Sequence, residues 1–138
     1  MGRWGLIPLV TAVLMASGCG RAGNHGVGQG IRQIASIAAE GALMAEDVAR
    51  GRSKATFVRT HGSELSAQAL HEAEKLNDEQ VQHRFMAPVK EAVKLAQDIG
   101  GAIEELRVAP MNRQQAREYQ AKLEEWDKQA EQIVEEKL

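Results

Sequence analysis

The stretch Phe85-Met-Ala-Pro-Val-Lys-Glu-Ala-Val-Lys-Leu-Ala-Gln-Asp-Ile-Gly-Gly-Ala-Ile-Glu-Glu-Leu106 carries the clearest structural pattern in the chain. Pro88 has no backbone N–H and clashes with a preceding helical turn, so a helix should begin or kink there. The apolar and small residues of the stretch recur at alternating intervals of four and three. This spacing places them on one stripe of an α-helix, a seam that packs against other helices. They are Phe85, Val89, Ala92, Ala96, Ile99, Ile103 and Leu106.

Three further segments repeat this spacing, so the sequence predicts four helices. Many of the seam positions are Ala or Gly, which predicts closely packed helices with little space between them. The three predicted seams are Ile31, Ile34, Ala38, Gly41, Ala45 and Val48; then Val58, Gly62, Leu65, Ala69, Ala73 (or Glu72) and Leu76; and last Ala116, Tyr119, Leu123, Trp126, Ala130 and Ile133.

Short breaks separate the helical segments. We expect Gly51 to end the first helix and Ser53 to cap the second. Ala109-Pro110 interrupts the chain again, and Asn112 followed by Gln115 indicates a capping box at the start of the last helix.

Connections this short make successive helices antiparallel neighbours. The predicted fold is an all-α, antiparallel up-down-up-down four-helix bundle, formed as one domain by residues 31–138. The alternative is a pair of long helical hairpins that assemble as a homodimer.

The first 19 residues differ from this pattern. Arg3 is followed by an apolar run from Leu6 to Ala16, and the small residues Ala16-Ser17-Gly18 lead into Cys19, the only cysteine. The run is about half of the ~20 residues that a membrane-spanning helix requires. The segment resembles the signal peptides of bacterial lipoproteins, although Ala16 occupies the position where Leu is commonest.

This resemblance implies that residues 1–18 are removed by cleavage between Gly18 and Cys19, and that Cys19 carries a diacylglyceryl thioether. Two or more acyl chains anchor a protein stably to a membrane. The expected location is the bacterial cell envelope. Because Gly20 rather than Asp follows the cysteine, the expected membrane is the outer one in a Gram-negative cell, and otherwise the outer face of the cytoplasmic membrane.

Between Cys19 and the first predicted helix the chain is rich in glycine, with five glycines in residues 20–30. Such a segment loses much backbone entropy on ordering and has little apolar surface to bury. We therefore expect residues 19–30 to be a flexible tether.

Charge excludes one class of partner. The chain has a formal net charge of −2, and removal of Arg3 with the leader makes it −3. A nucleic-acid-binding domain carries a clear basic excess, so no nucleic-acid partner is expected.

The predicted topology nevertheless gathers basic residues at one end of the bundle. The two stretches around the first and third connections lie at the same end, away from the tether, and are basic, whereas residues 124–138 hold six acids and two lysines. We expect a basic tip that meets an anionic partner, either an acidic envelope protein or a cell-wall polymer. Its basic residues are Arg50, Arg52, Lys54, Arg59, Arg107, Arg113 and Arg117.

No catalytic constellation stands out: Ser63, Ser66 and His71 share a helix but have no triad spacing, so the chain is not expected to be an enzyme, and no cofactor is expected. The alternative function is a bundle that binds a small ligand, metal or haem. Met44 and His61, which could face each other across the first hairpin, are its weak candidate ligands.

Overall fold

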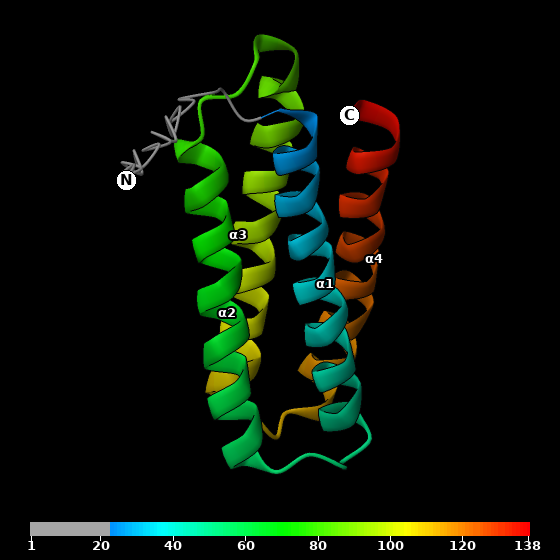
Figure 1. Cartoon of the computed structure of the whole chain (residues 1–138). Coiled ribbons are helices and arrows are strands. Elements are labelled where there is room, and N and C mark those ends of the chain that lie inside the picture. The colour runs from blue at the N-terminus through cyan, green and yellow to red at the C-terminus, as the bar shows by residue number, and fades with distance from the viewer. Residues whose placement is uncertain (1–22) are drawn as a thin grey trace, which may run out of the picture.

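The computed structural model describes residues 23–138 and shows an antiparallel four-helix bundle, which confirms the predicted fold class (Figure 1). Its elements, in chain order, are α1 (Asn24–Ala49), α2 (Ala55–Asp78), the 3₁₀ turn η1 (His83–Phe85), α3 (Met86–Val108) and α4 (Arg113–Lys137). Among the described residues, no helix is both long and apolar enough to cross a membrane.

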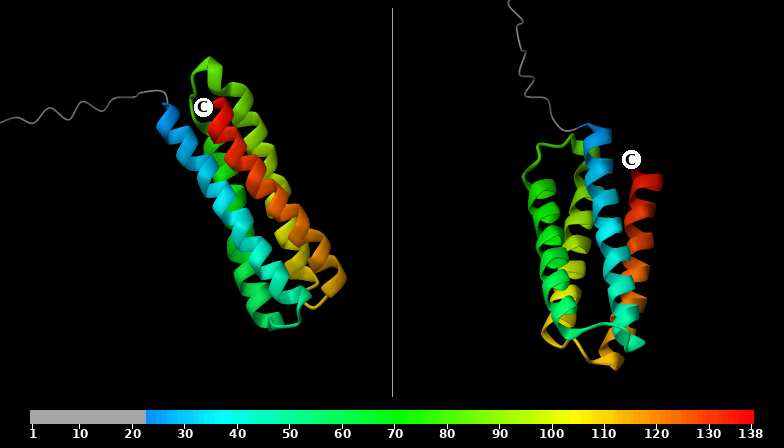
Figure 2. Two further views of the ribbon diagram at one scale, coloured as in Figure 1. Left: turned by 90° about the vertical axis from the view of Figure 1, so that its right-hand side faces the viewer. Right: turned by 60° about the horizontal axis from the view of Figure 1, so that its bottom comes forward.

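The two ends of the bundle are formed by different parts of the chain. The α1–α2 and α3–α4 connections lie together at one end, which we call the tip (Figure 1). The start of α1, the α2–α3 connection and the end of α4 lie at the other end (Figure 2). The most extensive helix packing is between α1 and α4 and between α2 and α3, whereas α1 with α2 and α3 with α4 form looser pairs.

The predicted seams form the core. Every seam residue of α1 and α3 is buried, and in α2 the seam passes through Ala73 rather than Glu72. In α4 the seam is buried at four positions, but Tyr119 and Trp126 are only partly buried. Both aromatic residues still pack against the core, so the predicted seam of α4 is confirmed, with these two side chains at its edge.

Small residues bring the helices close together. A Cβ added at Gly41 in α1 would lie 3.0 Å from Ile103 Cδ1, and one added at Gly62 in α2 would lie 3.2 Å from Arg107 Cβ. A buried hydrogen bond also joins α2 to α3: the Ser66 hydroxyl donates to the Gly100 carbonyl at 3.0 Å. The expectation of close packing from Ala and Gly is confirmed at these contacts.

Helix α1 begins earlier than the sequence indicated. The expected flexible tether over residues 19–30 is wrong for residues 24–30, which form the first two turns of α1. Val27 is fully buried, and Gly30 lies against Leu76 of α2. Burial of Val27 in a tertiary contact outweighs the cost of glycine in a helix, about 1 kcal/mol per residue. The predicted signal peptide, Gly18 and Cys19 lie outside the described residues.

Local signals at the helix ends agree with the structure in most places. Gly51 adopts φ +69°, and the N–H groups of Gly51 and Arg52 donate to the carbonyls of Val48 and Asp47, as in a Schellman motif. Asn112 Oδ1 accepts a hydrogen bond from the Gln115 backbone N–H at 3.1 Å, so the predicted Asn112 cap is confirmed. The reciprocal half of the capping box is absent, because the Asn112 N–H donates to the Ala109 carbonyl rather than to the Gln115 side chain.

The starts of α3 and α2 differ in how well they match the sequence. Pro88 lies in the first turn of α3, where its missing N–H would have no helical partner in any case. The prediction that Ser53 caps α2 is wrong. The residue at the N-cap is Lys54, without a side-chain hydrogen bond, because α2 starts one residue later than expected.

Candidate functional site

The tip gathers all seven predicted basic residues from segments far apart in the sequence. Arg50, Arg52 and Lys54 come from the α1–α2 connection and Arg59 from the first turns of α2. Arg107 ends α3, and Arg113 and Arg117 begin α4. The fold thus joins two basic stretches at one end, as the topology predicted (Figure 1).

Three of these arginines are engaged by nearby carboxylates. Arg50 pairs with Glu46 at 2.6 Å, and Arg52 with Asp47 at 2.7 Å. Arg107 forms a two-pronged contact with Glu104 at 2.7 and 2.5 Å, and its hydrogen bond holds the pKa of that carboxyl below its usual value. These three positive charges are therefore largely compensated within the bundle.

The other four basic residues remain available to a partner. Lys54, Arg59, Arg113 and Arg117 are exposed, and none forms an ion pair with another residue of the described part. Arg113 of α4 lies over the α1–α2 turn, so closely that a Cβ at Gly51 would come within 2.4 Å of its guanidinium. Lys54 thus lies in the α1–α2 connection, and the other three free cations lie in the first two turns of α2 or α4.

Large apolar side chains are exposed among these cations. Phe57 is 51% exposed near the start of α2, Val108 68% at the end of α3 and Met111 57% in the α3–α4 connection. Leu43, at 64%, lies nearly two turns before the end of α1. Large apolar side chains exposed at the same end of a molecule as free cations can form an interaction surface. We call this set of four cations and four apolar residues the tip surface.

The sequence pattern predicted the cations of the tip surface but not its apolar members. A signal was present, because Leu43 and Val108 fall off the seam positions of their helices, and Met111 lies in a break between helices. An apolar residue off the seam is often exposed without consequence. Only the fold shows that these residues gather at one end.

The weak candidate ligands Met44 and His61 occupy different environments. Met44 is buried in the core, with its methyl group near Gly62. The His61 ring stacks on Phe57 with its centroid 5.1 Å away, and its Nε2 lies 2.9 Å from a Glu40 carboxylate oxygen. Within residues 23–138, no group of three or more His, Cys, Asp or Glu side chains is arranged to hold a metal ion.

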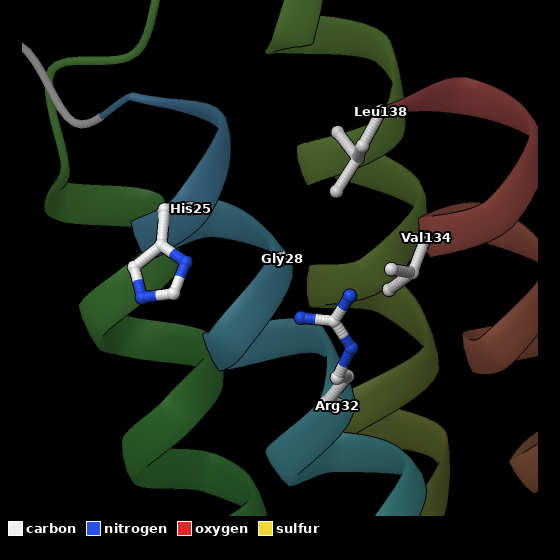
Figure 3. A pocket seen from close by; sticks show the side chains of 5 residues that line it. All are labelled: His25, Gly28, Arg32, Val134 and Leu138. Carbon is white, nitrogen blue, oxygen red and sulfur yellow. The ribbon is translucent and has the colours of Figure 1, made fainter.

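The end of the bundle opposite the tip has a hollow and exposed carboxylates. An open hollow of about 330 Å³ lies there, between α1 and α4. Figure 3 shows the residues that line it. On the α1 side it is bordered by His25, Gly28 and Arg32, and on the other side by Val134 of α4 and by Leu138, which follows that helix. The last turns of α4 add the exposed carboxylates Glu135 and Glu136, in keeping with the acidic character expected of this end.

Comparison of the chain with protein-family models, with curated protein sequences and with solved structures finds no match. Function is therefore inferred from the chain's own residues.

Proposed function

We propose that this chain is a lipid-anchored, non-enzymatic bundle of the bacterial cell envelope that binds an anionic partner protein through its tip surface. The observation that carries the proposal is the gathering of four unpaired cations and four exposed apolar side chains at one end. The segment that resembles a lipoprotein signal peptide joins the bundle at the other end.

The early start of α1 supports an orientation for the anchored bundle. Cys19 precedes Asn24 by five residues, a span of at most about 18 Å even when fully extended. Helix α1 has 26 residues and is about 39 Å long. An anchor at Cys19 would hold the acidic end near the lipid headgroups and present the tip surface away from the membrane.

The chemistry of the tip surface favours a protein over a cell-wall polymer. Cations alone suit either partner, since both can supply negative charge. Phe57, Val108 and Met111 add large apolar side chains, which gain free energy when they enter apolar pockets of another protein. A polyanionic polymer offers few such pockets. An acidic protein face with an apolar centre is therefore the partner proposed.

The anchor is tested by changing the proposed lipidation site. Cys19→Ser should leave the chain unprocessed and without label when cells are fed a clickable palmitate analogue, while the wild-type chain is labelled. Equal labelling of the two chains would overturn the lipid anchor without affecting the tip surface.

The tip surface is tested with two sets of variants of equal charge change. Arg59, Arg113 and Arg117 are replaced by Gln in one set, and the carboxylate-paired Arg50, Arg52 and Arg107 in the control set. Photo-crosslinking in intact cells should show at least about a tenfold loss of the crosslinked partner for the first set and a much smaller loss for the control.

Apolar substitution distinguishes the two kinds of partner. Met111→Ser together with Phe57→Ser should abolish capture of a partner protein, because both side chains are exposed and contribute little to the core. Capture unchanged by this pair, but still sensitive to salt, would indicate a polymer and contradict the proposed protein partner.

A further inference from the structure

A shallow groove runs along the flank of the bundle between α3 and α4, one of the two looser helix pairs. One hollow of about 430 Å³ is lined by Asp98, Gly101 and Glu105 from α3 and by Tyr119 and Trp126 from α4. A second hollow of about 250 Å³ continues it toward the acidic end and shares Asp98 and Trp126. We call the two together the flank groove.

The walls of the flank groove have a regular arrangement. Tyr119 and Trp126 are seven residues apart on α4, and Asp98 and Glu105 are seven apart on α3. Seven residues are two helical turns, so the two members of each pair lie on the same face of their helix, about 10 Å apart along its axis. An aromatic row thus lies across from a carboxylate row.

Glycine keeps the floor of the groove open. A Cβ added at Gly101 would meet no heavy atom of the described residues within 4 Å. Gly41 and Gly62, in contrast, have close neighbours that explain their small size. Gly101 carries the cost of glycine inside a helix, about 1 kcal/mol relative to Ala, with no packing contact that requires it. A glycine at position 101 is explained if the floor of the groove must stay open for a ligand.

The polar groups of the groove are held in place by the chain itself. The Tyr119 hydroxyl donates to the Glu105 carboxylate. This hydrogen bond, together with smaller effects of burial and of the charges of Glu105 and Glu118, raises the pKa of Tyr119 to about 12. Lys94 Nζ lies 2.5 Å from Asp98 Oδ2. Lys122 Nζ lies 5.2 Å from the centroid of the Tyr119 ring.

These contacts limit the kinds of ligand that the flank groove can bind. A cationic ligand would compete with Lys94 for Asp98 and with Lys122 for the Tyr119 ring. An anionic ligand would face two carboxylates, and a purely apolar one would desolvate them without offering a hydrogen bond. A neutral ligand with hydroxyl donors and flat apolar faces fits the remaining groups.

We propose that the flank groove binds a neutral oligosaccharide. The C–H face of a pyranose ring would stack on Trp126, and the ring two units further along the oligosaccharide would reach Tyr119, because the two aromatics are separated by about the length of two pyranose units. Sugar hydroxyls would donate to Asp98 and Glu105, whose carboxylates can each accept several hydrogen bonds. The site goes beyond the tip surface and does not depend on the anchor.

The proposal is tested through the fluorescence of Trp126. The chain has two tryptophans, Trp4 and Trp126, so Trp4→Phe in the full chain leaves Trp126 as the only tryptophan, which is excited at a wavelength that Tyr119 does not absorb. The protein is held in a detergent without a sugar headgroup and titrated with a β-1,4-linked tetramer of N-acetylglucosamine. We expect a saturable change in emission with half-saturation at or below about 1 mM. A response that shows no saturation up to about 10 mM overturns the proposal.

Two leucine substitutions locate the binding. Gly101→Leu would fill the floor of the flank groove and should weaken binding at least tenfold, whereas Ala67→Leu adds the same side chain to an exposed position of α2. Equal binding by the two variants overturns the assignment to this groove. Glu105→Gln, at an exposed position, should also weaken binding severalfold; full retention by this variant removes the carboxylate row from the proposal. None of these results bears on the anchor or the tip surface.

Discussion

The buried contact of α1 with α3 and α4 and the flank groove between α3 and α4 use glycine in opposite ways. At the buried contact, Gly41 lies against Ile103 of α3 and Leu123 of α4, and a Cβ would come within 3.0 and 3.4 Å of their nearest atoms. On the flank, Gly101 has no such neighbour among the described residues. Gly41 lies on the predicted seam of α1, whereas Gly101 lies off the seam of α3 and is exposed. A glycine in a helix can thus permit close approach or leave a surface open, according to its position on the helix.

Side-chain size explains much of this difference. Ala116, Leu123 and Ala130 are fully buried along the seam of α4, while Tyr119 and Trp126, which share that seam, are only partly buried. Alanines allow two helices to approach closely, whereas bulky rings hold them further apart. The two aromatics therefore lie at the edge of the core, over a groove.

The largest effect that tests this comparison is expected for Gly41→Ala. The added methyl group would press on the buried Ile103 side chain, and overpacking of this kind costs about 1–3 kcal/mol. The better helix propensity of Ala offsets up to about 1 kcal/mol of that cost. We expect a net loss of about 1 kcal/mol in the free energy of unfolding, measured by urea denaturation.

A double-mutant cycle shows whether Ile103 is responsible. Ile103→Val removes the Cδ1 atom nearest to the new methyl group, so the two changes together should destabilise less than the sum of their separate effects, by about 1 kcal/mol. Simple additivity would contradict a close contact at Gly41.

Gly101→Ala should have a smaller effect of opposite sign. Its Cβ enters open space, so only the gain in helix propensity remains, and we expect stabilisation by about 0.5–1 kcal/mol. The same urea denaturation measures it. Destabilisation by this substitution would mean that the groove floor is packed, and would remove the contrast with Gly41.

The smallest expected effect is a change in the pKa of Tyr119, which lies in the wall of the flank groove. Tyr119 is the only tyrosine, so its titration can be followed by the near-ultraviolet absorbance of the phenolate. The Glu105 hydrogen bond is the largest cause of its pKa of about 12, so Glu105→Gln should lower that pKa toward the ordinary value of 10.0. Glu118→Gln, which removes a weaker electrostatic contribution, is the matched control and should change the pKa much less.

The same shift has a consequence for stability. The folded chain holds the Tyr119 proton more tightly than the unfolded chain, whose pKa is about 10. The stabilisation of the fold that comes from the raised pKa of Tyr119 is therefore fully present below pH 10 and is lost as the pH rises through about 12. Glu104 depends on pH in the opposite sense. The hydrogen bond from Arg107 lowers the pKa of Glu104, so the stabilisation that this ion pair gives is lost as the pH falls through that lowered pKa. Stability that is unchanged between pH 9 and 12 in the wild type would contradict the hydrogen bond to Glu105.

Much of the architecture was predictable because it depends on short-range patterns. The spacing from Phe85 to Leu106 identified α3, and Asn112 and Gly51 marked helix ends correctly, since capping depends on a few adjacent residues. The basic residues of the tip also followed from topology alone. The exposed Phe57 and Met111 did not, because periodicity cannot show which off-seam residues gather at one end.

The order of apolar and small residues was enough to determine four antiparallel helices and the faces that they bury, because helical periodicity and short connections are local properties. Tertiary structure alone decided two features. It extended α1 back to Asn24 through burial of Val27, and it moved Tyr119 and Trp126 to the edge of the core. Each of these depends on contacts between residues distant in sequence, whose free energy outweighs the local preference of the chain.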